Sequence, residues 1–189
     1  MPDNKPFLAQ KGHYRDLIAF QKSECIYDIT YHFTHRFLRI GDRTIDQMVQ
    51  AARSGKQNIA EGSAASTTSR ETEIKLYNVA RASLQELLLD YEDYLRVRDK
   101  QVWAIDSEKG AQLRQVCLKH SDTAFYHEAL PARGDEAIAN IAITLLHQTD
   151  VLLRRLIERA QEDFLKIGGV REQMTRARRG YLNQQQKEK

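Results

Sequence analysis

The chain has 189 residues, of which 41% are hydrophobic and 29% charged, with three prolines, nine glycines and two cysteines. This length suits one domain with a sizeable core, and the scarcity of proline and glycine disfavours a protein of short strands and turns. Two cysteines, Cys25 and Cys117, are too few for a secreted disulfide framework, and neither a signal peptide nor 18 consecutive apolar residues occur. We therefore expect a cytoplasmic protein that does not interact with membranes.

The net charge of +3 is unevenly distributed along the chain. Residues 171–189 hold six basic and two acidic side chains, a net charge of +4, which leaves −1 for residues 1–170. A basic end on a nearly neutral body is suited to binding polyanions such as nucleic acid. A solvated tail that only keeps the protein soluble fits the same composition.

The first predicted helix spans residues 14–40 and carries two apolar stripes. Residues at spacings of three and four form its first stripe: Ile26, Ile29, Phe33, Phe37 and Ile40. A second set lies on a different face of the helix: Phe20, Tyr27, Tyr31 and Leu38. A helix with one buried face needs only one such stripe. The second stripe therefore predicts an oligomer interface.

The second and third predicted helices span residues 43–61 and 69–98. Gly41-Asp42 separates the second helix from the first, and Gly62 is placed to end it. The second helix is rich in small residues, which let helix axes approach closely. The third helix has one apolar stripe that contains a single charge, Arg81.

The last predicted helix spans residues 136–167 and ends at Gly168-Gly169. Residues 99–134 lack a long periodic stretch, although residues 107–119 are compatible with a short helix. Four long amphipathic helices without a strand pattern predict an all-α fold, an antiparallel up-down four-helix bundle over residues 14–167. Residues 99–134 form an insertion before its last helix, and residues 168–189 form a basic C-terminal tail.

Two segments near the end of the second helix and within the third carry a family resemblance. They are Asn58-Ile59-Ala60-Glu61-Gly62 and the stretch Ala80–Leu87, Ala-Arg-Ala-Ser-Leu-Gln-Glu-Leu. This arrangement resembles the ribosomal RNA intervening-sequence proteins, a bacterial family of small four-helix bundles. Residues 162–169, followed by the basic tail, resemble the extended branch of that family with a C-terminal suffix. The insertion at 99–134 departs from its short members.

The resemblance implies a homopentamer without enzymatic activity or a cofactor. A related protein, the accessory subunit of diversity-generating retroelements, is similar in fold and binds nucleic acid and a reverse transcriptase. Family members encoded within ribosomal RNA genes point in the same direction. The resemblance therefore implies RNA as a partner of this chain, although a shared fold does not by itself transfer a function.

Candidate catalytic and metal sites are weak in this sequence. Asp28, His32 and His35 lie on neighbouring faces of the first helix and are of types that bind zinc or iron. They supply three ligands at most, and no Glu-x-x-His motif of di-iron bundles occurs. A solvated or interfacial polar face is the better interpretation. We expect no catalytic residue, no metal and no cofactor.

Four polar residues near the end of the second helix form a different kind of candidate: Asn58, Glu61, Arg81 and Glu86. If Arg81 is buried in its stripe it needs a carboxylate partner, and Glu61 is the natural one. We predict that the set is a structural polar network that fixes helix register, with a ligand site as the alternative.

These features favour a non-enzymatic, homo-oligomeric protein that binds RNA. The predicted nucleic-acid contacts are four basic residues of the tail: Arg171, Arg176, Arg178 and Arg179. Two alternatives stay open at this point. One is a protein-interaction scaffold without a nucleic-acid role, and the other is a metal-binding bundle enzyme.

Overall fold

A computed structural model describes residues 13–187 of the chain. These residues form a short 3-10 turn, η1, followed by helices that are joined by loops, and they contain no strand. The elements are η1 (Tyr14–Asp16), α1 (Ile18–Phe37), α2 (Arg43–Ala65), α3 (Arg70–Arg96), α4 (Glu108–Lys119), α5 (Thr123–Ala129), α6 (Asp135–Ile167) and α7 (Val170–Lys187). The predicted all-α class is confirmed. Across residues 13–187, every helix is too short or too polar to span a bilayer.

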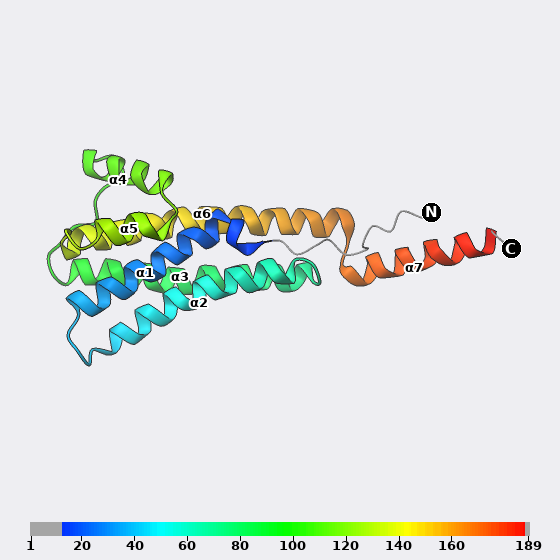
Figure 1. Cartoon of the computed structure of the whole chain (residues 1–189), viewed down its shortest axis with the longest axis horizontal. Helices are drawn as coiled ribbons and strands as arrows, with labels where there is room; N and C mark the ends of the chain where they lie inside the picture. Colours follow the sequence, from blue (N-terminus) through cyan, green and yellow to red (C-terminus); the bar gives the residue numbers. More distant parts are fainter. Residues whose placement is uncertain (1–12, 188–189) are drawn as a thin grey trace.

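Four long helices, α1, α2, α3 and α6, lie side by side and form what we call the helical body (Figure 1). Helix α1 packs against α2 and α6, and α3 packs against the same two helices. The insertion, with α4 and α5, covers one end of the body, while α7 projects beyond the opposite end (Figure 1). The insertion (residues 99–134) and the described part of the C-terminal tail (residues 168–187) therefore lie far from each other.

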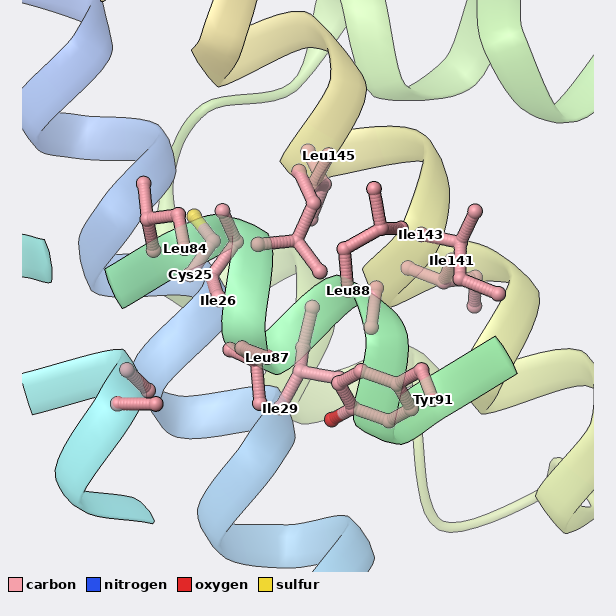
Figure 2. Packing of buried hydrophobic residues seen from close by; sticks show 14 of the residues in the cluster. Cys25, Ile26, Ile29, Leu84, Leu87, Leu88, Tyr91, Ile141, Ile143 and Leu145 are labelled. Carbon is pink, nitrogen blue, oxygen red and sulfur yellow. The ribbon is translucent and has the colours of Figure 1, made fainter. Parts of the chain in front are cut away.

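The core is built from the apolar stripes of these helices. Side chains from α1, α3 and α6 converge in its centre, where Ile29, Leu87 and Leu145 are fully buried (Figure 2). Tyr91 is also fully buried, and its hydroxyl donates a 3.0 Å hydrogen bond to Thr30 Oγ1 on α1. A buried tyrosine needs such a partner, because its hydroxyl loses its contacts with water on folding.

Helix α1 is shorter than the predicted helix at both ends. Residues 14–16 form the separate turn η1, and α1 ends at Phe37, so Leu38 is extended rather than helical. Ile40, the last member of the predicted first stripe, is fully exposed. The chain turns at Gly41, whose φ of +88° is a conformation that glycine adopts readily. The turn therefore begins earlier than the apolar pattern indicates.

Helix α2 extends past Gly62, so the prediction that it ends there is wrong. Gly62 is buried within the helix, and a Cβ at this position would lie 2.7 Å from the ring of Tyr77 on α3. Gly55 has the same role about two turns earlier, where a Cβ would lie 2.5 Å from Leu84. The small residues of α2 thus allow its close approach to α3.

The insertion is more helical than its sequence indicates. The short helix expected near residues 107–119 is present as α4, capped by the Ser107 side chain, and α5 was not predicted. A buried lysine of α1, Lys22, donates a hydrogen bond to the carbonyl of Cys117 and so ties α4 to the body. Burial lowers the pKa of this amine, because the charged form is poorly solvated there.

Candidate nucleic-acid interface

The junction between α6 and α7 lets α7 leave the body. Helix α6 ends at Gly168, whose φ is +80° and whose N–H donates to the carbonyl of Phe164. A Cβ at Gly168 would also collide with the carboxylate of Glu172. The exposed Glu172 side chain can move aside, so the positive φ is the constraint that favours glycine at this position. The tail that follows is a helix through Lys187, and it has no extensive packing against any other described element (Figure 1).

One face of α7 is apolar. Val170, Met174, Ala177 and Tyr181 recur at spacings of four, three and four, which places them on one side of a helix. Met174 and Tyr181 are each more than half exposed, at 56% and 62%. No other described element packs extensively against this stripe.

The remaining surface of α7 carries the predicted nucleic-acid contacts. Arg176 donates to the carbonyl of Ile167 at 3.3 Å, so it caps the last turn of α6. Arg171, Arg178 and Arg179 are exposed, and their guanidinium groups have no hydrogen-bond or ion-pair partner among the described residues, although the Arg171 carbonyl accepts from Thr175. The structure thus separates one structural arginine from three whose guanidinium groups are available to a ligand.

These three arginines have the chemistry of a phosphate-binding surface. A guanidinium group stays charged at all physiological pH values and offers paired N–H donors that match phosphate oxygens. Glu172 is the one acidic residue of α7. The excess of positive charge therefore persists along a helix that solvent surrounds on most sides.

The four residues predicted to form one polar network do not come together. Arg81 Nε donates to Asp150 Oδ1 of α6 at 2.8 Å, and Asp150 Oδ2 also lies 3.0 Å from Arg154 Nε. The predicted Arg81–Glu61 pair is therefore wrong, and Glu61 is exposed on α2. Because α3 packs against α6 as well as α2, Arg81 reaches a carboxylate on the other neighbour.

Asn58 and Glu86 occupy two further places. Asn58 Nδ2 donates to the Ser54 carbonyl at 2.8 Å, and Ser54 shares a 2.9 Å hydroxyl contact with Ser83 of α3. Glu86 is exposed and lines an open groove between α2 and α3 together with Asp90. Burial, together with the negative charges of Asp93 and Glu86, raises the pKa of Asp90. The charged residues that line this groove are all acidic.

The predicted oligomer-interface residues differ in their exposure. Phe20 is buried within the chain, where its ring packs edge-on against Tyr14. Tyr27 is half-buried beneath the ammonium group of Lys56, and Leu38 is half-buried against the core. Only Tyr31 is largely exposed, at 51%, and its ring stacks on His35. The continuous exposed stripe that the sequence indicated is absent.

Asp28, His32 and His35 do not converge on one point either. Asp28 Oδ2 lies 3.1 Å from Nε2 of His127 on α5, whereas His35 Nδ1 contacts the Tyr31 carbonyl at 2.8 Å. Within residues 13–187, no group of three or more His, Cys, Asp or Glu side chains is arranged to hold a metal ion.

In comparisons with known proteins, no family model, curated protein or solved structure matches this chain.

Proposed function

We propose that the protein is a non-enzymatic, homo-oligomeric RNA-binding protein whose contacts with phosphate come from α7. The observation that carries this proposal is the set of exposed arginines, Arg171, Arg178 and Arg179, on a helix that projects from a nearly neutral body. Electrostatic contacts with phosphates supply most of the affinity of sequence-tolerant binding. Arg176 contributes less, because its guanidinium group already caps α6.

We further propose that the helical body is an antiparallel up-down four-helix bundle of the intervening-sequence type and that it assembles as a pentamer. The short loops between α1, α2 and α3 support the topology, because such loops join antiparallel neighbours. The Asn58–Gly62 and Ala80–Leu87 motifs support the family. An oligomer would present several copies of α7 to one RNA strand and so multiply a modest affinity per chain.

The test compares two variants of equal charge. In one, Arg171, Arg178 and Arg179 are replaced by Gln; in the control, Arg39, Arg43 and Arg53, which are exposed on the body, are replaced by Gln. Fluorescence anisotropy with a labelled single-stranded RNA, at several salt concentrations, gives the affinity and its salt dependence. We expect the α7 variant to lose most of the binding, with a log–log salt slope reduced by about 2 for each α7 that contacts the RNA, since each phosphate contact contributes roughly 0.7 on single strands.

The control variant should bind nearly as tightly as the unmodified protein. Equal losses in the two variants would show that net charge alone drives binding and would overturn the assignment to α7. Absence of RNA binding by the unmodified protein at low salt would remove the nucleic-acid proposal itself.

A protein-interaction scaffold is the second candidate function. It is favoured by the exposed apolar stripe of α7, since Met174 and Tyr181 would be better buried against a partner. Replacing both by Gln leaves the arginines in place. If RNA affinity is unchanged in this variant, the stripe is not part of the RNA surface and is available for a protein partner.

A further inference from the structure

A cavity of about 380 Å³ lies between α6 and the insertion, beneath α4. The α4 helix above it lies toward the end of the body opposite α7 (Figure 1). Its walls are mostly apolar and include Val102, Trp103, Leu113, Ile143 and Val151. The volume is near the lower end of the range of small-molecule sites, about 300–1,000 Å³, and such sites combine apolar walls with a few fixed polar groups.

Most polar groups that line the cavity already have partners within the chain. The side-chain oxygen of Asn140 accepts from the Trp103 backbone N–H at 2.7 Å, and the indole N–H of Trp103 donates to Glu136 at 2.9 Å. The Asn140 amide nitrogen donates to the carbonyls of Gln101 and Glu136. The Thr144 hydroxyl donates to the Asn140 carbonyl at 2.8 Å. These groups shape the cavity but have little hydrogen-bonding capacity left for a ligand.

The exposed side chains of His147 and Arg114 also line the cavity and have no hydrogen-bond partner among the described residues. Gln148 differs from them because its unpaired group is buried. Its Nε2 donates to the Arg114 carbonyl of α4 at 3.2 Å, which fixes the orientation of the amide. Its Oε1 is buried and has no hydrogen-bond partner, the one such side-chain atom within the described residues. A buried acceptor without a donor is costly, so native proteins rarely keep one without a reason. The cavity thus has apolar walls and one unmatched acceptor.

We propose that this cavity binds a small, mainly apolar molecule that carries one N–H or O–H donor, and that this donor bonds to Gln148 Oε1. The apolar body of such a molecule would replace water against Trp103, Leu113 and Ile143. A water molecule satisfies the site less well, because a buried water needs two to four polar partners and most of the wall around Gln148 is apolar. The inference does not depend on RNA binding by α7.

Indole and N-methylindole form a matched pair of probes, because both present an aromatic body and only indole has a donor. Saturation-transfer NMR titrations of the full-length protein give the affinity for each. We expect indole to bind, and N-methylindole to bind about tenfold more weakly, since it leaves the acceptor unpaired and adds a methyl group beside it. This comparison needs no protein variant.

Three variants locate the site. Gln148→Met keeps the side-chain volume but removes the acceptor, so it should abolish the preference for indole. Val151→Trp adds bulk at a partly exposed position of the wall and should remove binding of both probes. A second cavity lies between α4 and α5, and Val151 does not line it, so this variant distinguishes the two cavities. Gln115→Met, on the exposed face of α4, is the matched control and should behave as the unmodified protein.

Circular dichroism establishes that each variant is folded before titration. The proposal is overturned if indole does not bind the unmodified protein up to its solubility limit, or if the two probes bind equally well. It is also overturned if Gln148→Met retains the full preference for indole, because the donor would then be recognised elsewhere.

Discussion

At the scale of single residues, Asp150 organises the contact between α3 and α6 by holding Arg81 and Arg154 together. The Arg81 and Asp150 side chains are about one-third exposed, at 34% and 31%, so water screens their attraction. We expect Arg81→Ala or Asp150→Ala to lower the free energy of unfolding by about 1 kcal/mol, with coupling between the two substitutions. Urea denaturation of the two single variants and the double variant measures both quantities.

Glu61→Ala is the control for this pair. Glu61 is exposed and has no part in the contact, so its replacement should change the unfolding free energy by less than about 0.5 kcal/mol. A loss at Glu61 as large as the loss at Arg81 would contradict the pairing seen in the structure.

Sequence alone could predict that Arg81 needs a carboxylate but not which one. The requirement follows from a charge within an apolar stripe, a local property. The partner depends on which helices become neighbours and on their relative register, which local patterns do not encode. Lys22 was missed for the same reason: its acceptor is a backbone carbonyl of α4, 95 residues away.

At the scale of elements, the pairing of α2 with α3 depends on two buried glycines. A Cβ at Gly55 would lie within 2.5 Å of Leu84, and one at Gly62 within 2.7 Å of Tyr77. We expect Gly55→Ala and Gly62→Ala each to cost about 1–3 kcal/mol through overpacking, although alanine favours a helix by about 1 kcal/mol. Chemical denaturation followed by circular dichroism measures the loss.

Gly180→Ala provides the matched control within α7. No atom lies within 4 Å of a Cβ at this position, so the substitution should leave the stability of the body unchanged and favour the local helix. If Gly62→Ala instead stabilises the protein, then Tyr77 moves aside easily and the close approach of α2 and α3 is not a constraint.

The same glycines show where element prediction succeeds and fails. Apolar periodicity located all four long helices, because their buried faces repeat over many turns. Gly62 was interpreted as a helix end, since glycine is common after a C-cap, yet here tertiary packing requires it inside the helix. Helix α5 has only seven residues, too few for a periodic pattern, and its one local signal is the N-cap Asp122.

At the scale of the whole molecule, α4 and α7, which contribute to the two candidate sites, lie toward opposite ends of the structure (Figure 1). The positive charge of α7 could be predicted from the sequence, because it depends only on the number of basic and acidic residues in that segment. The cavity beneath α4 was not, because its walls come from the loop before α4, from α4 and from α6, and no local pattern brings these together. Separation of the sites means that a variant at one end should leave binding at the other end unchanged.

Substitution of Tyr31 tests whether several chains assemble through α1. Tyr31 is the one member of the predicted interface that is largely exposed, whereas a charge at half-buried Leu38 would also disturb the core. Light scattering at micromolar concentration should give a mass well above 21.9 kDa for the unmodified protein. Tyr31→Asp should reduce that mass without loss of helicity, because an unpaired charge is costly in a packed interface.

The same variant connects assembly with RNA binding. Tyr31→Asp leaves every arginine of α7 in place, so a fall in RNA affinity beyond the small effect of one added negative charge per chain comes from the loss of neighbouring copies. We expect its affinity to drop towards that of a single α7, with the salt slope reduced because fewer phosphates are contacted at once. A Tyr31→Asp protein that stays assembled would move the interface away from this face of α1. A protein that dissociates but binds RNA unchanged would show that one α7 is sufficient and that assembly serves another purpose.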